Sequence, residues 1–572
     1  MYTLGLNTYH ADASAALLLN GEIICATEEE RFVRKKHFAG FPKNSIDYCL
    51  KYANISINEI TAVCVGRDTN AKLGKKLLYT LSNYRNATRL ISHRKSNWKN
   101  VNSIKALFEV YYGSCPPIKN IEHHRAHLAS AFFSSPFKSS TVVSIDGSGD
   151  FSTVMIARGN GSVIDVLESQ DYPVSVGFLY TAFTQFLGFP HYGDEYKVMG
   201  LAPYGEPHYF EKFKQIMWLG KKNILDWDKT FFSFKTGAVS YINDEPRVNE
   251  LFNKTKFQEL FGDFRQPTDG IDKRHKDIAC SLQRYTEHLI FGILERAFKL
   301  AKSENLCLAG GVAQNSVANG KILANTSFTN LYIPSAGHDA GISMGAAQYH
   351  YFNNLRNNRA EALYNANLGI EFSNDEIKSI LDEEGLEYTY LEDEKLFPYV
   401  AQKISSESVI GFFDGKAEFG PRALGSRSIL ADPRNSKAQE LLNAKIKRRE
   451  SFRPFAPSIL EEYGNEYFED YQFTPFMERV LTIKSEKRNL IPAVTHVDGT
   501  GRLQSVNKEL RPRYYSLISA FYELTGIPIL INTSFNENEP VVNHPREAIS
   551  TFLRTNLDTL ILGNFLLEKK EL

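Results

Sequence analysis

Three short turns, each rich in glycine or small residues and each placed directly after a run of apolar residues, constrain the fold of this chain more than any other feature. Glycine lets backbone amides come close to a ligand, and amides that follow a strand or open a helix bind anions well. One such turn alone is more often structural, but three after successive strands favour a nucleotide-type cleft. The turns are 146–150, 310–315 and 336–341, after the predicted strands 141–145, 306–309 and 331–333.

The length of the chain predicts two domains. One hydrophobic core rarely serves 572 residues. Segment 353–361 is polar and poor in apolar residues, as linkers are, and we place the boundary there. The predicted domains are 1–355 and 364–572, and alternating strand and helix patterns give a mixed α/β (α+β) class. The first domain should open with a β-meander, because Asn20-Gly21 is a strong hairpin signal between two apolar runs.

Charge and cysteine content argue against several classes of function. Lys and Arg total 66, and Asp and Glu also total 66, so no overall field would attract nucleic acid or an anionic membrane. The six cysteines are scattered without a Cys-x-x-Cys pair, which fits free thiols in a reducing compartment. No leader-like N-terminus or membrane-spanning apolar run is visible. We therefore expect a soluble, cytoplasmic protein without nucleic-acid or membrane partners.

A histidine motif at 122–127, Glu-His-His-Arg-Ala-His, is the sharpest candidate for a metal site. In a helix, His123 and His127 lie on one face and can share a metal ion, whereas His124 points elsewhere. A lone pair with this spacing is more often a polar helix face. Asp146 and Asp339, at strand ends, could complete a set of two imidazoles and two carboxylates suited to Fe(II), Mn(II) or Zn(II).

Arginines are concentrated in the second predicted domain, in 419–428 and 445–455, among Phe, Pro and Gly. Arg forks bind phosphate and carboxylate bidentately, so Arg422, Arg453 and Arg502 would together suit a polyphosphate or carbamoyl phosphate. The alternatives are a nucleic-acid patch or a solvated helix face. The interleaved aromatic residues disfavour a solvated face, and the neutral composition disfavours a general nucleic-acid binder.

Several longer motifs, in order along nearly the whole chain, give it a family resemblance. They are 28–32 (Glu-Glu-Glu-Arg-Phe), 123–127, 197–205 (Lys-Val-Met-Gly-Leu-Ala-Pro-Tyr-Gly), 419–434, 452–457 (Phe-Arg-Pro-Phe-Ala-Pro) and 532–536 (Asn-Thr-Ser-Phe-Asn). With these motifs the chain resembles the NodU/CmcH-type carbamoyltransferases. The resemblance implies an N-terminal domain of the actin-like ATPase superfamily, similar to threonylcarbamoyl transferase, and a C-terminal YrdC-like domain.

The resemblance also implies a two-step reaction. ATP, with Mg²⁺, and carbamoyl phosphate would give carbamoyl adenylate in the C-terminal domain. The carbamoyl group would then pass to a small-molecule acceptor, natural-product or sugar-like, at a metal site of the N-terminal domain, for which Fe(II) is favoured.

Matching positions carry over the functional residues of the family. The metal ligands would be His123, His127, Asp146 and Asp339. The contacts with ATP and carbamoyl phosphate would be Arg422, Lys447, Arg453, Arg502, Asn532 and Ser534. The contacts with the adenylate in the N-terminal domain would be Lys197, Gly200, Gly310, Gly311 and Asn315.

The acceptor hydroxyl needs a base, and the candidates are His10 and Asp12 in the first hairpin. His10 is our prediction for the base, with Asp12 orienting the imidazole or gripping the acceptor; alternatively, both residues only order the turn. Contacts with the acceptor are expected from 218–247 and 70–102. The acceptor itself, O- against N-carbamoylation and the oligomeric state, including a homodimer, stay open.

Three other functions compete with this hypothesis. A threonylcarbamoyl-type RNA-modification enzyme would need a basic face that the neutral composition does not suggest. An actin-like metabolite kinase would leave the arginine-rich second domain without a role. A non-enzymatic binding protein would be expected to lose several of the charged motif residues.

Overall fold

The computed structural model describes residues 1–82, 103–234, 237–447, 449–450 and 452–569. The chain divides into two compact units, Met1–Leu363 and Tyr364–Leu572, which we call unit 1 and unit 2. Both combine helices with sheets, which confirms the predicted mixed α/β class. Within the described part of the chain, no helix is long and apolar enough to cross a membrane.

Unit 1 contains two five-stranded sheets of the same topology. In the first sheet, β1 (Tyr2–Asn7) pairs antiparallel with β2 (Ser14–Leu19), and β2 pairs antiparallel with β3 (Glu22–Glu28). On its other side β1 is parallel to β4 (Ile60–Val65), which is parallel to β5 (Ile118–Asn120). The predicted meander is confirmed. Both residues of its Asn20-Gly21 turn have positive φ, 52° and 90°, as a two-residue hairpin turn requires.

The second sheet repeats this pattern, with the order β14-β13-β6-β7-β8. Its antiparallel strands are β6 (Ser139–Gly149), β7 (Ser152–Asn160) and β8 (Val163–Asp171). Parallel to β6 runs β13 (Asn305–Ala309), and parallel to β13 runs β14 (Asn330–Tyr332). Two sheets with one topology, each joined to helices, form the duplicated architecture of an actin-like ATPase domain, as predicted for the N-terminal half.

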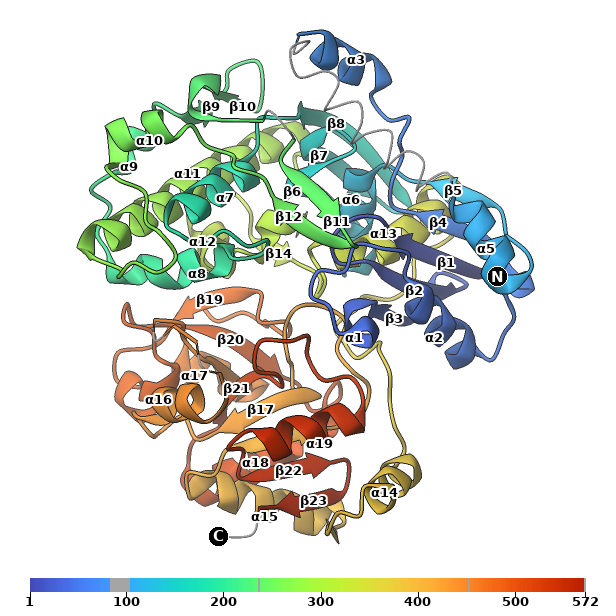
Figure 1. The fold of residues 1–572 in the computed structure, drawn as a ribbon, viewed down its shortest axis with the longest axis vertical. Coiled ribbons are helices and arrows are strands. Elements are labelled where there is room, and N and C mark those ends of the chain that lie inside the picture. The colour runs from blue at the N-terminus through green and yellow to red at the C-terminus, as the bar shows by residue number, and fades with distance from the viewer. Residues whose placement is uncertain (83–102, 235–236, 448, 451, 570–572) are drawn as a thin grey trace. The chain divides into compact units, whose positions relative to one another are not determined.

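Two helices pack closely against the sheets. α13 (Ile342–Gln348) contacts β1, β2 and β4, while α6 (His123–Ser134) contacts β6, β7 and β13 (Figure 1). α6 and α13 also pack on each other. A Cβ on Gly345 would lie 1.9 Å from the Ala126 carbonyl oxygen, so only glycine permits this approach. The functional histidines of α6 are thereby fixed between packed elements.

The other elements of unit 1 surround these sheets. Among them is the 29-residue helix α11 (Lys273–Ala301). The shorter helices are α1 (Glu30–Val33), α2 (Lys43–Ala53), α3 (Leu73–Ser82), α5 (Ile104–Tyr112), α7 (Val176–Phe186), α8 (Glu195–Leu201), α9 (Phe210–Phe213), α10 (Lys254–Phe261) and α12 (Ser316–Asn325). Two hairpins complete the unit: β9 (Met217–Leu219) with β10 (Leu225–Trp227), and β11 (Val239–Ile242) with β12 (Glu245–Val248).

The segment predicted as a linker packs on unit 1. Arg359 donates hydrogen bonds to the carbonyls of Phe132 and Ser135 at the end of α6, and its guanidinium lies 4.4 Å from the Phe132 ring centroid. These contacts attach the polar segment to unit 1, although its residues stay exposed or half-buried. Unit 1 therefore extends to Leu363 rather than ending at residue 355.

Unit 2 is built on one mixed nine-stranded sheet with the order β15-β23-β22-β16-β17-β21-β18-β20-β19. The strands are β15 (Thr389–Tyr390), β16 (Ile410–Phe413), β17 (Arg427–Ala431), β18 (Ala456–Leu460), β19 (Arg479–Thr482), β20 (Thr500–Val506), β21 (Ile529–Ser534), β22 (Thr559–Leu562) and β23 (Phe565–Glu568). The helices are α14 (Asn374–Glu383), α15 (Asp393–Ser405), α16 (Ala438–Leu442), α17 (Gly464–Tyr467), α18 (Pro512–Thr525) and α19 (Pro545–Arg554).

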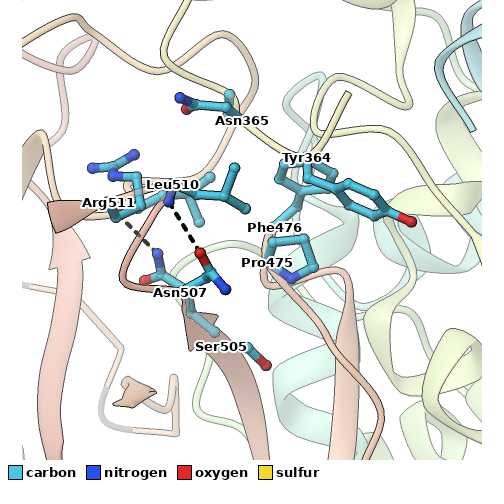
Figure 2. A pocket seen from close by; sticks show the side chains of 11 residues that line it. Tyr364, Asn365, Pro475, Phe476, Ser505, Asn507, Leu510 and Arg511 are labelled. Carbon is cyan, nitrogen blue, oxygen red and sulfur yellow. Dashed lines mark hydrogen bonds between the residues drawn. The ribbon is translucent and has the colours of Figure 1, made fainter. Parts of the chain in front are cut away.

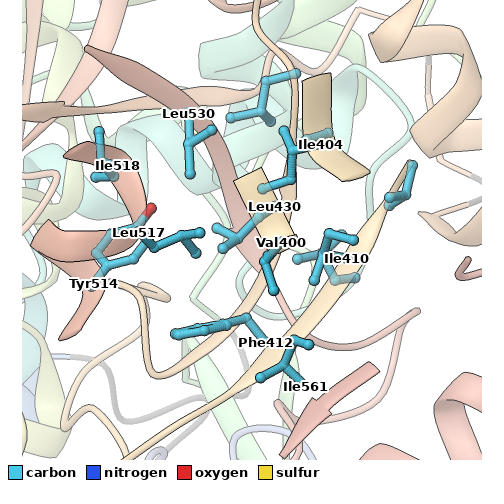
Figure 3. Close-up of a cluster of buried hydrophobic side chains, with 14 of the residues drawn as sticks. Val400, Ile404, Ile410, Phe412, Leu430, Tyr514, Leu517, Ile518, Leu530 and Ile561 are labelled. Carbon is cyan, nitrogen blue, oxygen red and sulfur yellow. The ribbon is translucent and has the colours of Figure 1, made fainter. Parts of the chain in front are cut away.

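The core of unit 2 lies between this sheet and its helices. Figure 3 shows Val400 and Ile404 of α15 and Leu517 of α18 gathered near Leu430 of β17, all buried. β21 is buried over its apolar residues and ends in Asn532, Thr533 and Ser534. A rigid strand thus carries polar residues of the predicted ATP site to its own end. The likeness of unit 2 to YrdC stays a prediction from the resemblance.

Candidate metal centre and arginine cluster

Helix α6 places two histidines on one face. His123 and His127 are one helical turn apart, both buried, with ring centroids 4.7 Å apart. His124 turns away, and its Nδ1 lies 2.9 Å from the Ser144 hydroxyl. This is the arrangement that the His-x-x-x-His spacing predicts.

Two aspartates from unit 1 face these imidazoles. Asp146 lies in β6, and its Oδ2 is 3.0 Å from His123 Nε2 and 3.3 Å from His127 Nε2. Asp339 opens a short 3₁₀ turn, and its Oδ1 is 3.7 Å and 3.4 Å from the same two nitrogens. One donor atom from each of the four residues lies within 4.8 Å of every other. All four side chains are buried.

Each carboxylate turns one oxygen to this centre and has the other held by the fold. Asp146 Oδ1 accepts hydrogen bonds from the backbone N–H groups of Gly147 (2.6 Å) and Gly311 (3.2 Å). Asp339 Oδ2 lies 2.7 Å from His10 Nδ1. Contacts of this kind orient metal ligands and tune their basicity.

The centre leaves buried polar atoms unsatisfied. His127 Nε2 and Asp339 Oδ1 have no hydrogen-bond partner among the described residues, although they are buried and face the same point. Orphaned buried polar atoms are costly, so such a set is stable when a ligand satisfies it. Two imidazoles and two carboxylates fit a divalent transition metal such as Fe(II), Mn(II) or Zn(II).

Charge coupling within the set is strong. Burial lowers the pKa of His127, but the facing carboxylates of Asp146 and Asp339 raise it, with a net value of about 9. Burial raises the pKa of Asp146, but the two facing imidazoles hold it well below its usual range. Without a cation the carboxylates therefore retain a proton on His127, which a bound metal would displace.

The two candidate bases are near this centre but are not paired with each other. His10 is bound to Asp339 and lies edge-on to His123, with ring centroids 5.2 Å apart. Asp12 instead pairs with His37, whose Nδ1 is 2.7 Å from Asp12 Oδ1. The idea that Asp12 orients the His10 imidazole is wrong, because Asp339 occupies that position. Tyr241, from the predicted acceptor stretch 218–247, lies 5.9 Å from the His10 ring. Of the other stretch, 70–102, residues 83–102 lie outside the described residues.

The residues predicted to contact the adenylate in unit 1 are differently placed. Gly311 supports Asp146, and Gly310 has φ 94°, with an added Cβ only 2.2 Å from the Ile145 carbonyl oxygen. Asn315 caps helix α12 through the Ala318 N–H and pairs with Gln283. Lys197 binds Asp194 at 2.8 Å.

The last member of that set, Gly200, lies within α8, the same helix as Lys197. The two glycines of 310–311 thus adjoin the metal centre. Asn315 and Lys197, by contrast, already have partners within the fold.

Unit 2 gathers arginines with little compensating charge. Burial lowers the pKa of the Arg502 guanidinium well below its usual range, and the charges of Arg422, Arg449 and Arg453 lower it further. Burial and the charge of Arg453 lower the pKa of Arg422 to about 10. Arg502 Nε is buried with no hydrogen-bond partner within the described ranges. Such mutual repulsion is relieved by an anion, and arginine forks suit phosphate.

The other predicted ATP contacts form two hydrogen-bond groups. Lys447, 2% exposed, donates to Ser534 Oγ (3.2 Å) and to Asn536 Oδ1 (2.8 Å). Asn532 donates to Ser458 Oγ and Gln504 Oε1, and its own Oδ1 is buried without a partner among the residues described.

Family models decide the classification of this chain. The model of the carbamoyltransferase N-terminus matches residues 2–348, and that of the carbamoyltransferase C-terminus matches residues 401–569. The chain belongs to the carbamoyltransferase family. The candidate metal centre and the arginine cluster lie one in each matched region of this carbamoyltransferase.

Curated relatives extend over the same length. Uncharacterized protein sll1178 of Synechocystis is 39% identical and covers 99% of this carbamoyltransferase and 97% of its own length. Nodulation protein NolNO of Sinorhizobium fredii is 36% identical over 99% of this chain and 80% of the relative.

Solved structures are more distant. Component A of (R)-2-hydroxyglutaryl-CoA dehydratase from Acidaminococcus fermentans is 16% identical, with a TM-score of 0.32 over 61% of this carbamoyltransferase and 98% of that chain. T. kodakarensis HypF is 13% identical, with a TM-score of 0.32 over 62% and 48%. Scores this low carry no argument, and the fold assignment rests on the sheet topology.

Sequence reasoning missed several residues beside the sites of this carbamoyltransferase. In unit 1 these are His37, Glu30 and Tyr192; in unit 2 they are Arg449 and His496. The signal for Arg449 and His496 was proximity in sequence to predicted contacts, since they precede Arg453 and Arg502 by a few residues. His37 carried no such signal, because only the fold brings it to Asp12.

A small recess in unit 2 does not coincide with the arginine cluster. Figure 2 shows Arg511 and Asn507 on one side of it and Pro475 and Phe476 on the other. Gln504 lies in its lining and also accepts the hydrogen bond from Asn532. Gln504 therefore connects the recess with Asn532, one of the predicted ATP contacts.

Proposed function

We propose that this carbamoyltransferase uses ATP and carbamoyl phosphate to make carbamoyl adenylate in unit 2 and transfers the carbamoyl group to a hydroxyl in unit 1. The observation that carries the proposal is the opposite chemistry of the two sites. Unit 1 of this chain contains a cluster of acids and imidazoles suited to a cation, and unit 2 contains a cluster of arginines suited to phosphates. Adenylation needs the arginine cluster, and activation of the carbamoyl carbonyl benefits from a cation.

In the adenylation step, carbamate released from carbamoyl phosphate would attack the α-phosphorus of Mg²⁺-bound ATP, and pyrophosphate would leave. Arg422, Arg453 and Arg502 would bind the phosphoryl oxygens and stabilise the charge that develops on them. Lys447 would act mainly through the loop of Ser534 and Asn536, to which it is bound. The unpartnered Asn532 Oδ1 is available to accept a hydrogen bond from a substrate N–H.

In the transfer step, His123, His127, Asp146 and Asp339 would hold a divalent metal, Fe(II) or a related ion. When bound there, such an ion would supply Lewis-acid polarisation of the carbamoyl group. The residues of the chain would do the rest. Gly147 and Gly311 fix Asp146, His10 fixes Asp339, and buried surroundings exclude water from the carboxylates.

The acceptor would be a sugar-like or other natural-product hydroxyl. Two named relatives are nodulation proteins, and the aromatic ring of Tyr241 beside His10 offers a surface on which a sugar ring can pack. His10 and Asp12 are the candidates to take the hydroxyl proton.

Release of pyrophosphate from purified chain tests the first step. ATP, Mg²⁺ and carbamoyl phosphate are supplied together and then each is omitted, beside an Arg453→Ala variant. We expect release that requires carbamoyl phosphate and is lost in the variant. Absence of release from folded, metal-loaded protein would contradict the adenylation mechanism and favour a kinase-like activity instead.

A further inference from the structure

The loop after helix α1 is folded tightly around Asp12. Asp12 and His37 both have positive φ, 59° and 54°, which is uncommon for residues with a side chain. Ala13 N–H donates to the Phe38 carbonyl (2.8 Å), and Tyr9 N–H donates to the Gly40 carbonyl (3.3 Å). Strained backbone that is held on both sides often marks a functional position.

One oxygen of Asp12 is held and the other is available. Asp12 Oδ1 is bound to His37 Nδ1 at 2.7 Å. Asp12 Oδ2 has no hydrogen-bond partner within the described part of the chain, and the residue is 8% exposed. The backbone carbonyl of Asp12 accepts from Asn7 Nδ2 at 2.9 Å. The carboxylate therefore has one oxygen fixed by His37 and one oxygen that the described residues leave without a partner.

His37 is itself held from three directions. Glu30 Oε2 accepts the backbone N–H of His37 at 2.7 Å. Its ring lies edge-on to Tyr192, with centroids 5.0 Å apart, and a Cβ on Gly193 would come within 2.7 Å of Nε2. The hairpin β11–β12 closes the loop, because Ala39 N–H donates to the Asp244 carbonyl at 2.7 Å. These contacts hold the loop and the imidazole beside Asp12.

The electrostatics agree with an ion pair. Burial lowers the pKa of His37, but the charge and hydrogen bond of Asp12 raise it, to about 9, with a smaller contribution from Glu30. When the His37 ring is protonated, its Nδ1–H donates a hydrogen bond to Asp12 Oδ1. His10 lacks this arrangement, since its Nδ1 is committed to Asp339.

We propose that His37 is a positioning residue for carbamoyl transfer, which aims the free oxygen of Asp12 at the acceptor hydroxyl. The inference rests on the proposed function. As the acceptor oxygen forms its bond to the carbamoyl carbon, its proton passes to Asp12 Oδ2. The bond between that carbon and the phosphate oxygen breaks, and AMP leaves with the electron pair. His37 keeps Asp12 Oδ1 from rotating into this role and holds the carboxylate ready.

Two acceptors test the proposal, one that needs a general base and one that does not. The full chain, loaded with Fe(II), ATP, Mg²⁺ and carbamoyl phosphate, is given glycerol or hydroxylamine. Glycerol needs a base, whereas hydroxylamine attacks an acyl adenylate without one and yields hydroxyurea. The measured quantity is the ratio of carbamoyl glycerol to hydroxyurea, because a general loss of folding or adenylation would lower both products together.

We expect His37→Ala to lower this ratio by about 100-fold, a typical contribution of positioned acid–base catalysis. His37→Gln, which keeps an N–H donor, should restore most of it. His208→Gln is the matched control: His208 also pairs with an aspartate, Asp277 at 3.3 Å, but 64% of its side chain is exposed and it has no role in either step.

An unchanged ratio in His37→Ala would overturn the proposal, as would a wild-type chain that makes hydroxyurea but no carbamoyl glycerol. Equal loss of both products in His37→Ala, with no recovery in His37→Gln, would show a structural role only. If the wild-type chain forms neither product, the proposed function itself fails, and this inference fails with it.

Discussion

The two candidate sites of this chain differ most in how their charges are balanced. In unit 1, two carboxylates face two imidazoles, and the outer oxygens of the carboxylates are bound by backbone amides and His10. In unit 2, the charges of Arg422, Arg449 and Arg453 act on Arg502, and Arg453 pairs with Glu450 at 3.6 Å. The first site is prepared for a cation and the second for an anion.

This contrast teaches that each site is incomplete in its own way. Unit 1 leaves acceptor and donor atoms orphaned around one point, whereas unit 2 leaves like charges in mutual repulsion. Substitutions in the two sites should therefore have different consequences. In unit 1, a substitution removes a side chain that would coordinate the metal. In unit 2, a substitution removes a contact with the bound phosphate and also a source of repulsion in the ligand-free protein.

The largest effect is expected from the metal centre. His127→Ala removes one of four donors, so we expect the variant to lose its bound metal. Carbamoyl transfer should fall by about a thousandfold, since Lewis-acid stabilisation is worth several kcal/mol. Pyrophosphate release, which belongs to unit 2, should be unchanged. Elemental analysis and the two activities check this.

His124→Ala is the control on the same helix, because His124 is buried like His127 but bonds to Ser144 instead. Its metal content should match that of the wild-type chain. A His127→Ala variant that retains the metal would break the comparison, because the four-residue set would then not be the cation site.

Arg502→Ala should lower pyrophosphate release by about 100- to 1000-fold, as loss of a preorganised charge contact at a reacting phosphate does. The melting temperature of the ligand-free variant should not fall, because the substitution also removes a buried like charge. Arg546→Ala is the control, since Arg546 pairs with Glu383 and Glu384 on the surface of unit 2.

Thermal unfolding beside the pyrophosphate assay separates these effects. A variant that loses activity and stability together would mean that Arg502 supports the fold. In that event the arginines of unit 2 would stabilise the fold rather than form an anion site, and the comparison between the two units would fail.

A third prediction uses the pH dependence of unit 2. Burial lowers the pKa of His496 to about 4, below the value near 6.5 expected in the unfolded chain. Between these values the unfolded chain holds the extra proton, so stability falls as pH drops from about 6.5 to 4, by at most about 3 kcal/mol. His496→Gln should lessen this fall, which urea unfolding at several pH values measures. Equal pH profiles for the two proteins would contradict the prediction.

Much of the fold was predictable because it is encoded locally. Apolar runs predicted β1 to β3 of the first sheet and β6, β13 and β14 of the second, and Asn20-Gly21 predicted the first hairpin turn, whereas β5, β7 and β8 were not predicted. Unit 2 begins at Tyr364, where the second predicted domain begins, but segment 353–361 belongs to unit 1, because Arg359 is bound to carbonyls at the end of α6. Sequence alone does not show where a long polar side chain will find acceptors.

The sites divide in the same way. The spacing of His123 and His127 predicts a shared helix face, but the pairing of Asp12 with His37 depends on a loop returning across 25 residues. Composition also cannot separate arginines by role. Arg427, in the same block as Arg422, is fully buried and bonded to the Asp414 and Gly415 carbonyls, which is a structural use.

The smallest effect is expected at Asn315, where the resemblance and the contacts within unit 1 suggest different roles. Its Oδ1 caps α12 by accepting the Ala318 N–H at 3.0 Å, and both ends of its amide pair with Gln283. Asn315→Ser keeps a capping oxygen but loses the amide pair, so the stability loss should be about 0.5–1 kcal/mol. If the cap is its only role, carbamoyl transfer by Asn315→Ser will equal that of the wild-type chain once both are folded. A clear rise in KM for ATP-dependent transfer, with stability and pyrophosphate release unchanged, would instead place Asn315 at the adenylate. Unit 1 would then contain residues that bind an anionic substrate as well as residues that bind a cation.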